Sequence, residues 1–231
     1  MFGIFKILRL TRGFLILSRE KDLIPENLIR SLPAPIKIFF KVIPSNKKSN
    51  LSESLQKLGP TWIKMGQFLS TRPDIIGNKL SIHLRGLQDS LPPFDKKHVE
   101  QAFIESFGED YKKKFKKIDE PIAAASIAQV HKAIIKSDGK SQTVAVKILR
   151  PNIEGKIKKD LNDFYLAAKI LEKFSSEARR LRVLEVVKTL EESLSMEVDL
   201  RLEAAAQSEI IDNTKNDDFI EIPKIFWDLT S

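Results

Sequence analysis

Lys147 is the residue whose sequence neighbours most clearly indicate a chemical role. It ends the apolar segment Val-Ala-Val-Lys at residues 144–147, and a lysine in an apolar strand costs desolvation energy unless a negative group pairs with it. Residues 123–126, Ala-Ala-Ala-Ser, carry side chains small enough for backbone N–H groups to approach a ligand. A fixed ammonium that follows such a loop predicts a phosphate-binding site.

Two acidic residues further along the chain are candidate partners for this lysine. Asp199 and Glu203 are four residues apart in a predicted helix, so they share one face of it. Like charges in this arrangement repel each other by about 0.2–0.5 kcal/mol, which indicates a cation nearby. The alternative is a solvated acidic face, on which Glu197 and Arg201 form an ordinary surface pair. With Lys147 as the cation, the pattern predicts an ATP site of the kinase type, with alanine where protein kinases have glycine.

A second group of polar residues lies in the segment Lys-Met-Gly-Gln at residues 64–67. Lys64 and Gln67 are three residues apart on one face of a predicted helix. Gly66 stands beside them, and a glycine inside a helix costs roughly 0.5–1 kcal/mol relative to alanine. The glycine therefore indicates either a space that a ligand needs or a close contact between helices, and both interpretations remain open.

Hydrophobic periodicity predicts the elements that position these residues. A turn at residues 137–140, Ser-Asp-Gly-Lys, predicts a hairpin. The predicted elements are helices at 51–58, 61–70, 80–87 and 98–107, strands at 129–135 and 143–149, helix from 153 to about 207 with a break near 175–176, and strand character at 220–229. The predicted fold class is α+β.

The composition excludes several kinds of site. The chain has no cysteine and three widely separated histidines, which argues against disulfides, thiol catalysis and a zinc site. A net charge of +8 favours phosphates or an anionic membrane surface as partners. Nucleic acid is not expected, because no nucleic-acid-binding motif is present.

The first 17 residues combine large apolar side chains with Lys6, Arg9 and Arg12. This composition is typical of an interfacial helix, with apolar side chains in the lipid and cations near anionic headgroups. The alternative is a helix that docks on the protein core. The charges interrupt the apolar run and no small-residue cleavage site follows it, which argues against a signal peptide.

Four segments resemble, in order, the signature motifs of the UbiB family of atypical kinase-like proteins. Residues 64–67 resemble its KxGQ motif, 123–126 its alanine-rich loop, 144–147 its nucleotide-lysine strand and 197–203 its ExD motif with the following glutamate. The resemblance extends over about residues 51–230. The site residues that it implies are Lys64, Gln67, Glu197 and Asp199 for catalysis, and Ala123, Ala124, Ala125, Ser126, Lys147 and Glu203 for nucleotide binding.

The resemblance implies a protein-kinase-like small lobe with an antiparallel sheet, preceded by a helical extension that covers the active site. We expect membrane-proximal helices and a connector in residues 1–50, the extension in 51–115 and the lobe in 116–231, with a helical insert at about 150–190. Lys147 would bind the α- and β-phosphates and pair with Glu203, and Lys64 would lie near Glu197 and Asp199. The expected cofactors are ATP or ADP with Mg²⁺.

The family supports ubiquinone biosynthesis as ATPases or small-molecule kinases, so we expect an atypical kinase or ATPase. The expected partners are a quinone-type lipid, other quinone-biosynthesis proteins and the cytoplasmic side of a bacterial inner membrane. The sequence contains no His-x-Asp motif and no Asp-Phe-Gly motif. In protein kinases the first motif supplies the catalytic base and the second supplies a ligand of the metal ion. We therefore expect an N-terminal fragment without the C-terminal lobe and without the Mg²⁺ ligands. The alternative is a non-catalytic lipid-binding or scaffold protein.

Overall fold

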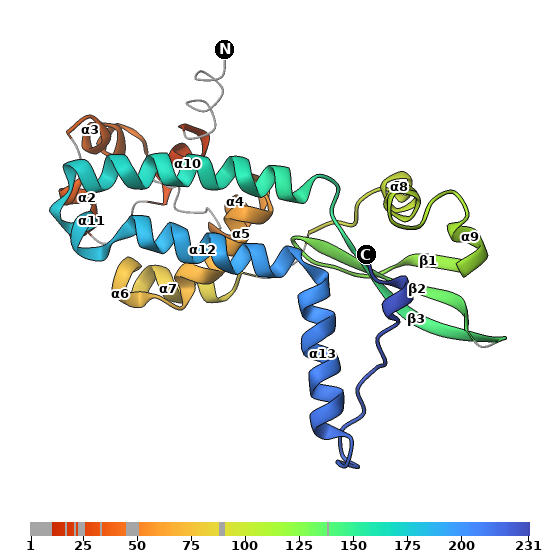
Figure 1. Ribbon diagram of the computed structural model, residues 1–231. Coiled ribbons are helices and arrows are strands. Elements are labelled where there is room, and N and C mark those ends of the chain that lie inside the picture. The colour runs from red at the N-terminus through yellow and green to blue at the C-terminus, as the bar shows by residue number, and fades with distance from the viewer. Residues whose placement is uncertain are drawn as a thin grey trace.

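The computed structural model describes residues 11–16, 18–20, 22, 26–32, 34–44, 51–87, 91–137 and 139–231. A helical part and a sheet part meet near the start of the helix labelled α13 (Figure 1). The helices are α2 (Glu26–Ser31), α3 (Ala34–Val42), α4 (Leu51–Leu58), α5 (Pro60–Ser70), α6 (Pro73–Ile76), α7 (Asn78–Arg85), α8 (Lys96–Phe107), α9 (Tyr111–Lys114), α10 (Ile153–Phe174), α11 (Ser176–Leu181), α12 (Val183–Val198) and α13 (Leu200–Thr214). The strands are β1 (Phe115–Ala124), β2 (Ala128–Ser137) and β3 (Lys140–Leu149). The predicted α+β class is confirmed.

The strands form an antiparallel sheet in the order β1-β2-β3. Strands β2 and β3 pair without interruption from Ala128 opposite Leu149 to Ser137 opposite Lys140. Gly139, with φ +74°, allows the tight connection between them, because only glycine adopts this backbone region without steric cost. The predicted hairpin is therefore confirmed, and its unbroken register places Lys147 opposite Val130.

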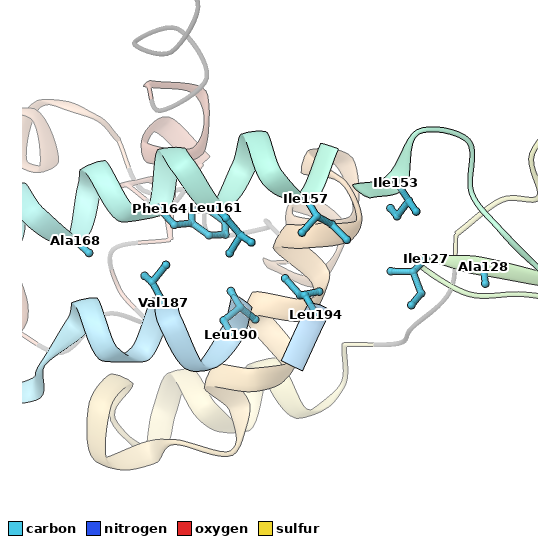
Figure 2. Packing of buried hydrophobic residues seen from close by; sticks show 10 residues of the cluster. All are labelled: Ile127, Ala128, Ile153, Ile157, Leu161, Phe164, Ala168, Val187, Leu190 and Leu194. Carbon is cyan, nitrogen blue, oxygen red and sulfur yellow. The ribbon is translucent and has the colours of Figure 1, made fainter. Parts of the chain in front are cut away.

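Helices α10 and α12 lie side by side and bury the largest apolar stripe of the helical part (Figure 2). Ile157, Leu161, Phe164 and Ala168 of α10 face Val187, Leu190 and Leu194 of α12. The spacing of three or four residues puts each set on one helix face. Ile127 and Ala128, next to the alanine-rich loop, belong to the same buried cluster, so this core also anchors one end of the sheet.

Helix α5 packs against this pair of helices through an aromatic contact. The rings of Trp62 and Phe164 meet edge to face, with their centroids 4.8 Å apart. Such a geometry is favourable because the edge of one ring is positive and the face of the other is negative. The contact fixes α5, and with it Lys64, relative to α10 and to the α12 helix that packs on α10.

The helical segment after β3 is divided at more points than the sequence predicted. The expected break occurs at Ser175, whose side chain caps α11 by accepting a hydrogen bond from the N–H of Ala178. Further breaks occur at Arg182, where φ is +51°, and at Asp199. Helix α12 thus continues past residue 190 and ends at Val198.

Helix α8 covers one face of the sheet through a cluster that includes Phe103, Phe115, Ala133 and Ile135. Phe226 and Leu229, near the end of the chain, pack against the same cluster. The prediction of strand character at 220–229 was wrong, because Pro223 has no N–H for a ladder and its carbonyl accepts from the side chain of Gln207 at 2.6 Å. The segment docks through side chains and ends in the short 3₁₀ helix Trp227–Leu229.

The N-terminal residues that the structure describes dock on the protein. Residues 11–16 are helical, Gly13 lies against the indole of Trp62, and the ring of Phe14 contacts those of Phe39 and Phe40 at 4.9 and 5.1 Å. This favours core docking for residues 11–16. The rest of the predicted interfacial helix, residues 1–10 and 17, lies outside the described residues. No helix within the described part is long and apolar enough to cross a membrane.

Candidate nucleotide site

The side chain of Lys147 meets that of Glu203 although 56 residues separate them. Its Nζ lies 2.5 Å from Oε2 of Glu203, and the two side chains are 37% and 56% exposed. Because side chains alternate along a strand and the next residue, Ile148, is buried beside α8, Lys147 projects from the opposite face of the sheet. The structure thus brings together the pair that the sequence suggested.

The degree of exposure changes the reason for this pairing. The sequence argument rested on burial of the lysine, yet more than a third of its side chain is exposed. An ion pair so open to water contributes about 0–1 kcal/mol to stability. The contact is therefore better understood as a means of orienting the ammonium than as a source of stability.

Lys64 forms a second, more buried contact between distant parts of the chain. Its Nζ lies 2.8 Å from Oε2 of Glu197, with side-chain exposures of 14% and 34%. Lys64 belongs to α5 and Glu197 to the last turn of α12. The pair therefore ties the helical extension to the segment that precedes Asp199.

Asp199 is not in a helix with Glu203, contrary to the sequence expectation. It is the N-cap of α13, and its carboxylate accepts from the N–H of Arg201 at 3.1 Å and from the Arg201 guanidinium at 2.9 Å. Aspartate is a preferred N-cap because its side chain satisfies an N–H that the helix leaves free. The hydrogen bond from Arg201 holds the pKa of Asp199 below its ordinary value. The alternative surface pair of Glu197 with Arg201 is also wrong, because Arg201 binds Asp199.

Gly66 serves a contact between helices. A Cβ atom there would lie 2.7 Å from a methyl carbon of Leu87 and 2.9 Å from one of Leu55, closer than carbon atoms pack. The space beside Gly66 is thus filled by leucines. Gln67 donates from Nε2 to the carbonyl of Leu87 at 3.5 Å, so the glycine and the glutamine hold the extension together while Lys64 reaches the lobe.

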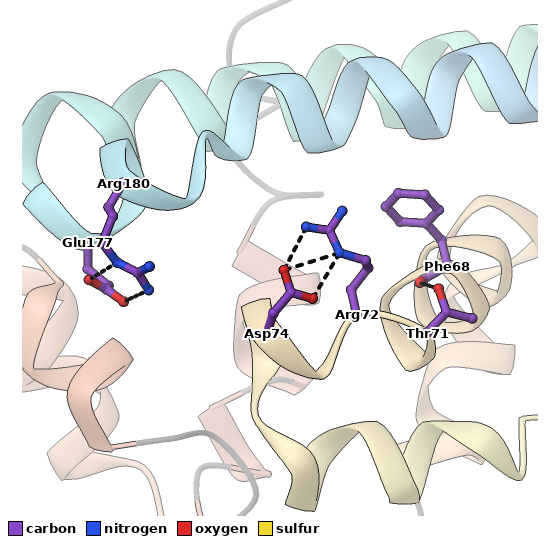
Figure 3. A network of polar contacts seen from close by, with 6 residues as sticks. All are labelled: Phe68, Thr71, Arg72, Asp74, Glu177 and Arg180. Atoms are coloured by element: carbon purple, nitrogen blue, oxygen red, sulfur yellow. Dashed lines mark hydrogen bonds and ion pairs between the residues drawn. The ribbon is translucent and has the colours of Figure 1, made fainter.

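Two ion pairs between residues close together in the sequence lie just after α5 and on α11 (Figure 3). Arg72 binds Asp74 with distances of 2.9 and 2.7 Å, and Arg180 binds Glu177 on α11. Arg72, Asp74 and Arg180 are exposed, whereas Glu177 is half-buried. The hydrogen bond from Arg72 also lowers the pKa of Asp74. Each pair joins residues only two or three positions apart, so neither of them links distant parts of the chain.

The four residues of the alanine-rich loop differ in exposure. Ala123 and Ala124 end β1, and the N–H of Ala125 donates to the carbonyl of Ala128 at 2.8 Å. Ser126 is fully buried, whereas Ala123 is exposed. The surface that the loop offers to a ligand is therefore formed by alanines and backbone, as a close approach to phosphate requires.

Sequence reasoning missed two arginines near the site. Arg201 engages Asp199, and Arg150 donates to the carbonyl of Ala125 in the loop. The available signals were the spacing of two residues between Asp199 and Arg201 and the position of Arg150 directly after the lysine strand. Neither spacing alone tells a structural arginine from a solvated one.

The described residues contain no metal-binding cluster made by protein side chains alone. No group of three or more histidine, aspartate or glutamate side chains that could hold a metal occurs there. Mg²⁺ in nucleotide enzymes takes one or two carboxylates together with phosphate oxygens and water. No chemical step is assigned to the metal.

Comparison with known proteins identifies the family. Residues 86–231 match the ABC1 atypical kinase-like domain. Proteins named "Probable protein kinase UbiB" are similar to this chain. The protein of Marinobacter nauticus is 38% identical over 211 residues, which cover 87% of this chain and 38% of that protein. The protein of Pseudomonas entomophila is 38% identical over 190 residues, which cover 82% of this chain and 35% of that protein. That of Pseudomonas aeruginosa is 39% identical over 181 residues, covering 78% and 33%.

This chain thus spans about a third of the length of these relatives. The matched domain includes the alanine-rich loop, Lys147 and Glu203, together with the sheet and α13 that carry them. The chain belongs to the family of ABC1 atypical kinase-like domains, and the UbiB resemblance inferred from its motifs is confirmed.

Proposed function

We propose that this chain binds ATP or ADP and forms the nucleotide-binding half of a UbiB-type atypical kinase or ATPase. The observation that carries the proposal is the contact of Lys147 with Glu203 at 2.5 Å. An ammonium has three hydrogens to donate, and Glu203 engages one of them while it orients the group. A lysine held in this way supplies a fixed positive charge to the nucleotide phosphates.

The alanine-rich loop supports the same proposal. The loop connects β1 to β2 and lies next to the end of β3, the strand that contains Lys147. In kinases the corresponding loop covers the phosphates. Alanine adds a Cβ and restricts φ relative to glycine, so this loop would hold its backbone groups with less freedom.

The substrate is proposed to be a small molecule or lipid on the route to ubiquinone and not a protein, although the relatives are named as probable protein kinases. Lys64 joins the extension to Glu197 beside the nucleotide site. Helices held over a pocket would exclude water and a bulky substrate. The proposed setting is the cytoplasmic side of a bacterial inner membrane, with other quinone-biosynthesis proteins as partners.

The test is nucleotide binding to this chain and its Lys147→Ala variant, measured by titration calorimetry with ATP and with ADP. We expect the variant to bind at least about ten-fold more weakly, a loss of about 1.4 kcal/mol. Lys136→Ala is the matched control, because Lys136 is an exposed lysine at the hairpin end of β2. Equal affinity of all three proteins would support the alternative, a lipid-binding or scaffold protein with a vestigial nucleotide site.

A further inference from the structure

Arg150 holds the alanine-rich loop through both its backbone and its side chain. Its N–H donates to the carbonyl of Ile127 at 2.8 Å. Its guanidinium donates to the carbonyl of Ala125 from Nε at 3.0 Å and from Nη2 at 2.8 Å. Arg150 thus binds the backbone on both sides of Ser126, at the point where the loop ends and β2 begins.

The same guanidinium binds the segment that leads from the extension into α8. Its Nη2 donates to the carbonyls of Pro92 and Leu91 at 3.0 and 3.4 Å, and it lies 5.7 Å from the centre of the Phe94 ring. The side chain of Gln129 adds a contact by accepting from the N–H of Phe94 at 3.0 Å. Arg150 therefore joins the loop to the connection between the extension and the lobe.

The chemistry of these contacts favours arginine. The planar guanidinium presents several N–H groups in fixed directions, so it binds carbonyls from two segments with a defined geometry, whereas the ammonium of lysine is a compact charge on a flexible stem. Hydrogen bonds from a charged donor are also about twice as strong as neutral ones. The carbonyl of Ala125 is thus held firmly.

Fixing this carbonyl has a consequence for the loop. The carbonyl of Ala125 and the N–H of Ser126 belong to one planar peptide unit. When Arg150 holds the oxygen, it also sets the direction of that N–H. The orientation of a backbone donor in the loop therefore depends on a side chain that lies outside the loop.

We propose that Arg150 is a positioning residue for nucleotide binding, and this rests on the nucleotide site proposed above. It fixes the backbone of the alanine-rich loop and makes its conformation depend on the segment at 91–94. If the helical extension moved, the Arg150 side chain would move with segment 91–94 and would change the conformation of the loop. Arg150 itself does not touch the nucleotide.

The test measures ATP affinity of this chain with Arg150→Ala and Arg150→Lys. We expect both variants to bind about ten-fold more weakly, which corresponds to about 1.4 kcal/mol. Guanidinium chloride at low millimolar concentration, against equal potassium chloride, should restore part of the affinity of Arg150→Ala and leave Lys147→Ala unchanged. A loss of general structure would not respond in this way.

Arg179→Ala is the matched control. Arg179 also donates to backbone carbonyls, those of Glu172 and Lys173, but at the far end of α10. We expect its ATP affinity to equal that of the unmodified chain. If Arg150→Ala does not fold, Arg150→Lys carries the test.

Two outcomes are distinguishable. Wild-type affinity in a folded Arg150→Lys, with weakened binding in Lys147→Ala, would overturn the role of Arg150 alone. Wild-type affinity in Lys147→Ala would overturn the nucleotide site itself.

Discussion

Two lysine–glutamate contacts join distant parts of the chain, and they differ in their surroundings. Lys64 and Glu197 meet at 2.8 Å with side-chain exposures of 14% and 34%. Lys147 and Glu203 meet at 2.5 Å with exposures of 37% and 56%. The first pair lies between packed helices, and the second lies where the sheet meets α13.

If Lys147 binds the nucleotide as proposed, the difference separates a structural contact from a functional one. A charge that is largely removed from water needs its partner, because an uncompensated buried charge is costly. A charge that remains half in water gains little from its partner but stays accessible to a ligand. Identical residue types at similar distances can thus serve different purposes, and burial tells them apart.

The largest expected effect on stability comes from removing the more buried lysine. Lys64→Ala should lower the free energy of unfolding by about 1–3 kcal/mol, because Glu197 loses a charged partner. Lys147→Ala should lower it by no more than about 1 kcal/mol. Urea denaturation followed by circular dichroism measures both values.

Lys188→Ala on the exposed side of α12 is the control for this comparison, with an expected change within about 0.5 kcal/mol. The comparison fails if Lys147→Ala destabilises the chain more than Lys64→Ala does. In that case the exposed pair, and not the buried one, would hold the two parts together.

A smaller effect is expected at Asp199, where the partner is an arginine in the same helix turn. Its pKa lies below the ordinary value of 3.8 because Arg201 donates to it, so its contribution to stability exists above that value and is lost as the pH falls through the lowered pKa. Asp199→Asn keeps an N-cap but loses the charge. The variant should be less stable than the unmodified chain at pH 7, and the difference should shrink below about pH 3.8. A constant difference from pH 7 to pH 3 would contradict this.

Much of the fold could be predicted because local signals agreed with tertiary packing. The hairpin of β2 and β3 and the helices around Gly59 and Gly108 follow from turn residues and apolar spacing. The segment at 220–229 could not be predicted, because β-propensity describes the fit of side chains to a partner strand. Here Phe226 and Leu229 pack on the cluster beneath α8, and no ladder is formed.

The candidate site was predictable in its residue types but less so in its geometry. That Asp199 or Glu203 would pair with Lys147 followed from charge and spacing along the chain, and the choice of Glu203 followed from the resemblance to the UbiB family. The helix break at Asp199 did not, because an aspartate inside a helical pattern is compatible with either a surface position or an N-cap. The role of Gly66 depended on Leu55 and Leu87, whose approach to it is set by the packing of α4, α5 and the turn after α7.

The most direct test of the central claim is a double-mutant cycle for ATP affinity with Lys147→Ala, Glu203→Ala and the combined variant. If Glu203 acts by orienting Lys147, each single change weakens binding and the combined variant binds no more weakly than Lys147→Ala alone, because the two residues work as one unit. Effects that add, or an Lys147→Ala variant that binds ATP as tightly as the unmodified chain, would contradict the account.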